Sequence, residues 1–291
     1  MRFTAAVDGL AGRDLATFVQ ELERSGFDAA KVPDSICYPE HSESRYPYTR
    51  DGRREFLADR EFLDPFVLTA AIAAVTRRLR TVVSVLKLPV RHPLLVAKQA
   101  ASAAVVSDNR LVLGVGMSPW PDDYAILGIP WDGRGARFDE CISILQTYLG
   151  GGFAAYHGEH FDLPSLRIKP VPDQPVPLLI GGHSRASLRR AARVGAGWSA
   201  AGCSMEELSE MLDFLTAERR RCGRQDLPFD VHVSIQHDAT DPHIERLAAL
   251  GVTHAAVNWS DRYAPDQGVP DLHERLERVA EFGERVVARW T

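Results

Sequence analysis

The 291-residue sequence predicts a (β/α)8 barrel, or TIM barrel, formed by one domain over residues 1–291. Apolar runs with strand-like and helix-like periodicity alternate eight times along the chain. The run from Thr81 to Leu88 is rich in β-branched residues and, apart from Lys87, uncharged, as expected for a strand buried on both faces of a parallel sheet. Neither a linker nor a change in composition divides the chain, and its length is typical of this fold.

The central unit of the predicted barrel is the stretch from Leu79 to Met117. A strand ends near Leu88, and Pro93 then occupies a position that suits the first turn of a helix. Apolar residues recur at helical spacing as far as Val106, and Leu111–Val115 resumes the strand pattern. Two parallel neighbours need such a crossover, and its hand should be right-handed.

The same alternation covers the remaining elements. Before the central unit we expect strands at Arg2–Val7 and Ala29–Pro33 and helices at Asp14–Ser25 and Asp64–Thr76. After it, a Pro-rich link leads to the other expected elements, which are a helix at Arg134–Leu149, a hairpin at Phe153–Leu163 turning at His157-Gly158, strands at Val176–Ile180, Trp198–Ala201, Phe229–Ile235 and Thr253–Trp259, and helices at Ala186–Val194, Met205–Arg221, Pro242–Leu250 and Leu272–Trp290. The hairpin is an insertion before the fifth barrel strand.

A long loop follows the second strand. Ser35 to Leu63 lacks periodicity and is rich in Tyr, Pro, Arg and Glu. Loops of this length in compact domains are usually binding loops or lids. We expect it to close over a bound ligand through Tyr38, Tyr46, Tyr48, Arg45 and Arg50.

Composition excludes several classes of partner. The net charge of -5, with acidic and basic residues interspersed, provides no basic stripe for nucleic acid or anionic lipid. The first residues, MRFTAAVDGL, lack a long apolar run, which predicts a cytoplasmic protein without membrane contact. The four cysteines lie far apart and predict reduced thiols. HGEH (157–160) carries two imidazoles, but it falls at the hairpin turn without a third ligand, so we expect no metal.

In a barrel of this kind, chemistry is found where the strands end. The expected strand ends carry Asp34-Ser35, SVLK (84–87), GVGM (114–117), GGHS (181–184) and Asn258-Trp259. The glycines of LGVG are compatible with a ligand contact or with a tight turn alone. GGHS offers free backbone amides at a helix start, which suit a phosphate, and it is also compatible with an ordinary glycine turn capped by Ser184.

Taken together, these segments resemble one family. SGFDAAKVPDS, LKLPVRHPLLVAKQAA, NRLVLGVGM, LGIPWDGRGARFDE, YHGEHFDL and PLLIGGHSRASLRRAARVGAGW are similar, in this order, to luciferase-like monooxygenases, specifically the branch that uses the deazaflavin coenzyme F-420. The resemblance covers about Leu22 to Trp198. It implies an eight-stranded barrel, often dimeric, that binds a flavin or deazaflavin with its ring over the barrel mouth.

The resemblance also implies site residues. The GGHS segment corresponds to the family's cofactor-phosphate loop, and Ser84-Val85 to the place of a non-prolyl cis peptide against the ring. The cofactor-binding residues implied in this way are Asp34, Ser84, Val85, Lys87, Met117, Gly181, Gly182, His183 and Ser184. Two positions depart from the family pattern: Ser35 stands where relatives commonly have His, and Met117 where some have a catalytic Glu. Asp34 and Ser35 are therefore the only catalytic candidates, and the reaction itself is not carried over.

Three functions follow as hypotheses. The leading one is an F-420-dependent oxidoreductase that moves a hydride between the deazaflavin and a small organic substrate, with the chain acting as a homodimer. The second is an FMN-dependent monooxygenase of the same family. The third is a non-catalytic protein that binds flavin or deazaflavin, because the usual acid and base partners are missing.

Lys87 is the one charge in an apolar strand. A buried ammonium must find an anion or lose its proton. Under the family reading, Lys87 stabilises the negatively charged reduced ring. In the alternative, its stem covers apolar surface while the ammonium reaches solvent or an acidic neighbour such as Asp34.

Overall fold

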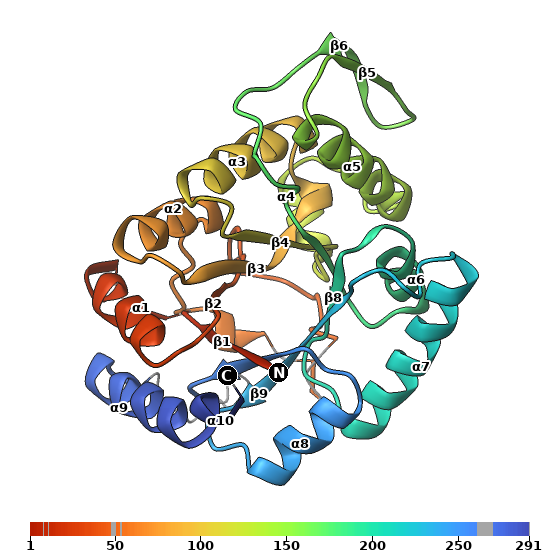
Figure 1. The fold of residues 1–291 in the computed structure, drawn as a ribbon. Coiled ribbons are helices and arrows are strands. Elements are labelled where there is room, and N and C mark those ends of the chain that lie inside the picture. Colours follow the sequence, from red (N-terminus) through yellow and green to blue (C-terminus); the bar gives the residue numbers. More distant parts are fainter. Residues whose placement is uncertain (8, 11, 48–50, 53, 261–269, 291) are drawn as a thin grey trace.

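A computed structural model describes residues 1–7, 9–10, 12–47, 51–52, 54–260 and 270–290. In this part of the chain, eight parallel strands form a closed barrel in the order β1-β10-β9-β8-β7-β4-β3-β2, and helices surround it (Figure 1). The barrel strands are β1 (Arg2–Ala6), β2 (Ala29–Val32), β3 (Arg80–Lys87), β4 (Leu111–Gly116), β7 (Leu178–Gly181), β8 (Gly197–Ser199), β9 (Asp230–Gln236) and β10 (His254–Asn258). The predicted fold class is confirmed.

Most helices cross over between successive barrel strands. They are α1 (Leu15–Arg24), α2 (Pro65–Val75), α3 (Pro93–Val106), α4 (Pro121–Ile126), α5 (Arg134–Leu149), α6 (Arg185–Val194), α7 (Met205–Arg221), α8 (Asp241–Ala249), α9 (Leu272–Phe282) and α10 (Ala288–Trp290), with short 3-10 turns at Gly12–Asp14, Glu55–Leu57 and Leu88–Val90. The bounds of α3, α5 and α7 agree with the sequence prediction. None of the helices in the described ranges is both long and apolar enough to cross a membrane.

Three local predictions need correction. The Pro-rich link after β4 contains a helix, α4, because Pro121 occupies its first turn. The hairpin pairs β5 (Ala154–His157) with β6 (Asp162–Leu166), so its second strand extends past the expected end at Leu163, and the turn spans 158–161. The last helix breaks into a π-helical turn at Gly283–Val287, where the backbone approaches so closely that a Cβ on Gly283 would lie 2.8 Å from Ser25 Cβ.

The hairpin β5–β6 lies outside the ring of helices, beside α5 (Figure 1). It is thus an insertion, as expected. All four cysteines are free thiols.

Strand residues alternate between two environments. One set packs against the helices in the main core and includes Phe3, Val83, Leu113, Ile180 and Trp198. The other set faces the inside of the barrel. There, β2, β3, β4 and β7 contribute a small apolar cluster, and beside it a narrow space is lined by both apolar and polar residues, the polar ones being Thr4, Lys31, Ser84, Ser199, His232 and Ser234. The interior of the barrel therefore carries most of its polar side chains on the side of β1, β8 and β9.

Candidate functional site

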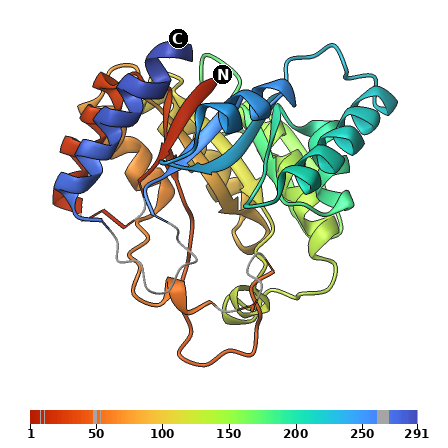
Figure 2. The ribbon, with the colours of Figure 1, turned by 90° about the horizontal axis from the view of Figure 1, so that it is seen from below.

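The carboxyl ends of the barrel strands form the barrel mouth. Figure 2 shows the long loop after β2 and the short helix α4 at this end, opposite both chain termini. Active sites of TIM barrels are built from the loops at this end. The mouth therefore brings together the strand-end segments that the sequence singled out.

Ser84-Val85 is a non-prolyl cis peptide bond, as the family resemblance implied. The bond lies where the register of β3 against β4 shifts, between Val83 and Leu86. The Val85 side chain packs across the neighbouring strands. A Cβ added at Gly116 would lie 2.7 Å from Val85 Cγ2, and one added at Gly181 would lie 2.8 Å from Val85 Cγ1.

These contacts give a structural reason for two glycine segments. In LGVG, Gly114 and Gly116 leave room for the β3 backbone and for Val85, and a Cβ on Gly114 would lie only 2.2 Å from the Val83 carbonyl oxygen. Gly181 does the same at the end of β7. The glycines thus leave room for Val85 and the β3 backbone beside β4 and β7.

The GGHS segment connects β7 to α6. Gly182 has φ +112°, a conformation that favours glycine, and a Cβ there would lie 2.9 Å from Ser187 Oγ. Ser184 is the N-cap of α6, and its hydroxyl oxygen accepts a hydrogen bond from the Ser187 backbone N–H at 3.2 Å. The expected cap is confirmed. Other first-turn amides of this ten-residue helix remain available at a positive helix end, which suits an anion.

Two hydrogen bonds also connect the GGHS segment to residues of and after β8. The Trp198 indole N–H donates to the Gly182 carbonyl oxygen at 2.9 Å, and His183 Nε2 accepts from the Ala201 backbone N–H at 2.9 Å. Burial lowers the pKa of His183 below its ordinary value. The imidazole is therefore neutral at pH 7 and holds the loop as a hydrogen-bond acceptor.

Asp34 lies directly after β2 with a side chain that is 1 % exposed. Arg91 binds its carboxylate with two nitrogens, each at 2.9 Å, and the Lys87 backbone N–H donates to Oδ2 at 2.8 Å. These bonds tie the end of β2 to the segment after β3. Asp34 thus holds the ends of β2 and β3 together at the mouth. Ser35 lies half-buried beside it. Their catalytic role stays a prediction.

Lys87 is buried, and its ammonium lies 2.7 Å from Asp123 Oδ2. Asp123 is 3 % exposed and also accepts a hydrogen bond from the Ser118 hydroxyl. The acidic neighbour of Lys87 is thus Asp123 on α4, whereas Asp34 contacts only the Lys87 backbone. Met117 lies half-buried against the core, just before Ser118. The role of Lys87 toward a reduced ring stays a prediction.

The long loop packs onto α4. Arg54 donates to Asp122 Oδ2 at 2.8 Å, and its guanidinium lies 4.6 Å from the centre of the Trp120 ring. Tyr46 stacks on Trp120 with ring centres 5.0 Å apart, and Tyr38 lies 5.0 Å from the Arg54 guanidinium. The loop is therefore joined to the segment after β4. Together they form one continuous surface beside the mouth.

The three remaining residues of the expected lid are Arg45, Tyr48 and Arg50. Arg45 donates to the Asp51 carbonyl oxygen at 2.8 Å, so it holds the loop's own shape. Tyr48 and Arg50 lie outside the described residues. Closure over a bound ring stays a prediction.

Sequence reasoning missed the partners of two buried charges: Arg91, which pairs with Asp34, and Asp123, which pairs with Lys87. It also missed Arg54 and Asp122, which join the loop to α4. Burial acts to raise the pKa of Asp122, but hydrogen bonds from Ser42, Ser44 and Arg54 outweigh it and lower the pKa. A usable signal was present, because two acidic residues directly after Pro121 are typical of a first helical turn.

Comparison with known proteins shows the family of the chain. The family model of luciferase-like monooxygenases matches residues 3–288. The chain belongs to this family. Membership extends the resemblance, which covered about Leu22 to Trp198, to nearly the whole chain.

Similar proteins of this family include characterised and uncharacterised members. The chain is 43 % identical over 267 residues to an uncharacterized protein of Mycobacterium tuberculosis, covering 92 % of each chain. It is 28 % identical to an F-420-dependent glucose-6-phosphate dehydrogenase of Beutenbergia cavernae, over 99 % of this chain and 82 % of that protein. The coenzyme F-420-dependent tetrahydromethanopterin reductase of Methanopyrus kandleri has the same fold, with a TM-score of 0.76, 14 % identity, and coverage of 100 % and 99 %.

Proposed function

We propose that this luciferase-like protein is an F-420-dependent oxidoreductase that transfers a hydride between the deazaflavin and a small organic substrate at the barrel mouth. The observation that carries the proposal is the GGHS segment at the barrel mouth, where Gly182 has positive φ and Ser184 caps α6, so that backbone amides would face a bound phosphate. The relatives with F-420 in their names support the choice of cofactor.

The residues at the mouth fit such a cofactor. Gly182 leaves space that a Cβ would fill, and Ser184 caps a helix whose free amides suit a phosphate. The cis segment would face the ring, and the surface formed by the long loop and α4 would exclude water. When bound, the deazaflavin supplies the hydride chemistry, and the protein contributes orientation and an electrostatic setting.

In this proposal, the buried ion pairs at the mouth hold the structure around the cofactor in place. Asp34–Arg91 and Lys87–Asp123 hold the strand ends in place, so the floor of the site is rigid before any ligand arrives. Because both pairs are internal, they leave few acid or base groups for a substrate. This feature favours the non-catalytic binding protein as the second candidate. The homodimer also stays a prediction.

Fluorescence titration tests the cofactor. We expect F-420 to bind more tightly than FMN. If FMN binds at least tenfold more tightly, a difference of about 1.4 kcal/mol, the F-420 assignment is wrong and the monooxygenase reading replaces it. Tight F-420 binding without any hydride transfer over a panel of alcohols, aldehydes and sugar phosphates would favour the binding protein.

Gly182→Val tests the phosphate loop. The side chain would be strained at φ +112° and would collide with Ser187, so we expect at least tenfold weaker binding of FMN and F-420 but little change for riboflavin, which has no phosphate. Gly223→Val is the matched control, because Gly223 also has positive φ (+65°) but lies in open space at the end of α7. Equal losses for FMN and riboflavin would remove the phosphate role.

A further inference from the structure

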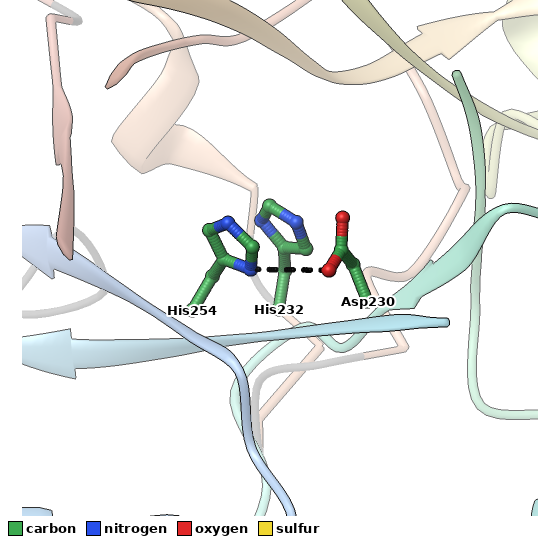
Figure 3. Close-up of side chains that lie close together, drawn as sticks. All are labelled: Asp230, His232 and His254. Carbon is green, nitrogen blue, oxygen red and sulfur yellow. Dashed lines mark ion pairs between the residues drawn. The ribbon is translucent and has the colours of Figure 1, made fainter. Parts of the chain in front are cut away.

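Three ionisable side chains meet inside the barrel at the end opposite the mouth. Asp230 and His232 lie two residues apart on β9 and so share a face, and His254 begins β10 and pairs in register with His232. Figure 3 shows the two imidazoles and the carboxylate grouped on the same side of the sheet. The rings stack with centres 4.1 Å apart, and one ligand atom from each residue lies within 4.8 Å of the others.

Several polar atoms of this group are buried without a hydrogen-bonding partner. His232 and His254 are 5 % and 2 % exposed, and Nε2 of each is unpaired. Asp28, in the turn before β2, adds a third such atom, because its buried Oδ2 lies 3.8 Å from His254 Nε2, too far for a hydrogen bond. Buried polar atoms in native proteins nearly always have partners, so three orphans at one place require an explanation.

The hydrogen bonds around His254 indicate which nitrogen offers a lone pair. We assign the single proton of Thr253 Oγ1 to the Val231 carbonyl oxygen, 3.2 Å away, and Oγ1 also lies 2.8 Å from His254 Nδ1. We therefore assign the ring proton to Nδ1, which donates to Thr253. Nε2 then carries a lone pair that faces the Asp28 carboxylate, and two acceptors in this arrangement repel each other unless a cation lies between them.

We propose that His232, His254 and Asp230, with Asp28 as a second carboxylate, bind a divalent transition-metal ion of the zinc class. Two imidazoles and carboxylate oxygens form a donor set that suits Zn²⁺ and its first-row neighbours, and binding would turn one ring out of the stack so that both lone pairs point at the ion. The Thr253 hydroxyl orients His254 as outer partners of metal-bound imidazoles commonly do.

The charges around the site are compatible with a dication. Arg2 and Arg80 approach Asp28 only to 4.0 and 3.7 Å, so neither satisfies its carboxylate. Arg2 is 60 % exposed, and solvent screens its charge. Lys31, deeper in the barrel, donates to Ser234 Oγ at 2.9 Å. Two carboxylates would balance the ion.

The proposed ion has a structural role. It would join β9, β10 and the turn before β2 at the amino-terminal end of the barrel, where TIM barrels concentrate stability rather than chemistry. Because the mouth lies at the other end, this inference does not depend on the proposed function.

Metal titration of the protein without an affinity tag tests the site. After dialysis against a chelator, we expect calorimetry with zinc chloride to give one equivalent bound. His232→Gln and His254→Gln should each weaken binding at least tenfold, whereas His157→Gln should not, since His157 forms an exposed pair with Asp162 on the hairpin. Zinc at a hundredfold excess over Kd should raise the parent's Tm by about 5 °C and leave that of His254→Gln unchanged.

Two results would overturn the proposal. One is zinc binding that never saturates, or that His157→Gln reduces as much as His254→Gln. The other comes from the parent protein and needs no variant to fold: crystals soaked in zinc chloride and measured at the zinc absorption edge should give an anomalous peak bonded to His232 and His254. A peak elsewhere, or ordinary water density at this place, excludes the metal.

Discussion

The two ends of the barrel use buried charges in different ways. At the mouth, carboxylates and cations meet at hydrogen-bonding distance, with 2.7 Å for Lys87–Asp123 and 2.9 Å for Arg91–Asp34. At the amino-terminal end, Asp28 lies 3.7 to 4.0 Å from Arg2, Arg80 and His254. Similar residue types thus form closed pairs at one end and an open cluster at the other.

This difference indicates which groups at each end of the barrel can still bind a ligand. The closed pairs at the mouth hold loops and strand ends, which leaves cofactor recognition to backbone amides, glycines and the cis segment. The open cluster has unpaired atoms that a cation could satisfy. A buried charged group is therefore informative about function only once its partners are known.

Breaking a closed pair should have the largest effect. Lys87→Met leaves Asp123, which is 3 % exposed, as a buried charge without its cation, and we expect the free energy of unfolding to fall by about 3–5 kcal/mol. Chemical denaturation measures this loss. Arg221→Met, which removes the exposed pair with Glu218, is the matched control and should cost less than about 1 kcal/mol.

The double variant Lys87→Met with Asp123→Asn separates stability from cofactor chemistry. Removing both charges should recover most of the loss, because no unpaired ion remains. In this background, a loss of affinity relative to the parent that is larger for reduced than for oxidised cofactor would support the proposed role of Lys87 toward the ring. Binding of both redox states as tight as in the parent would exclude that role.

The sequence was sufficient to predict the barrel. Its strands are continuous apolar runs, and helices such as Pro93–Val106 carry clear start signals, so local pattern and final structure agree. The errors fall where tertiary contacts decide. The π-helical turn at Gly283 follows from close contact with Ser25, a residue more than 250 positions away, and no local pattern records it.

The candidate site was predictable only in part. Gly182 and Ser184 carry local signals for a turn and a cap, and Ser84-Val85 was found through the family resemblance. The partners of Asp34 and Lys87 were not, because Arg91 and Asp123 lie 57 and 36 positions away and pairing depends on how loops pack. The histidine cluster could not be predicted from the sequence for the same reason, since His232 and His254 come together only through the register of β9 and β10.

A smaller effect is expected from acid at the mouth. The pKa of His183 is lowered by burial, so the unfolded chain takes up a proton near pH 6.5 while the folded protein does not. The stability that neutral His183 provides is complete above pH 6.5 and is lost as the pH falls toward the lowered pKa. Because the ring is partly exposed, we expect a loss of up to about 1 kcal/mol between pH 7.5 and 5.0.

The measurement compares denaturation of the parent and His183→Gln at both pH values. Gln keeps an acceptor for the Ala201 N–H but does not titrate, so the variant should lose less stability than the parent. Identical losses in the two proteins would show that His183 keeps its ordinary pKa, and the loop would then lack the neutral acceptor described above.

The smallest effect is expected from Asp230→Asn at the amino-terminal end, and the same substitution at the mouth, Asp123→Asn, serves as its comparison. Burial outweighs the nearby arginines and raises the pKa of Asp230, so its negative charge is disfavoured in the folded, metal-free protein. Asp230→Asn should therefore change the free energy of unfolding by less than about 1 kcal/mol, at zero or in the stabilising direction, since the side chain is 39 % exposed. Asp123→Asn, which leaves buried Lys87 without its anion, should cost about 3–5 kcal/mol. Denaturation in the presence of a chelator measures both. If the two substitutions cost the same, Asp230 already has a partner that satisfies its charge, and the contrast between a closed mouth and an open cluster does not hold.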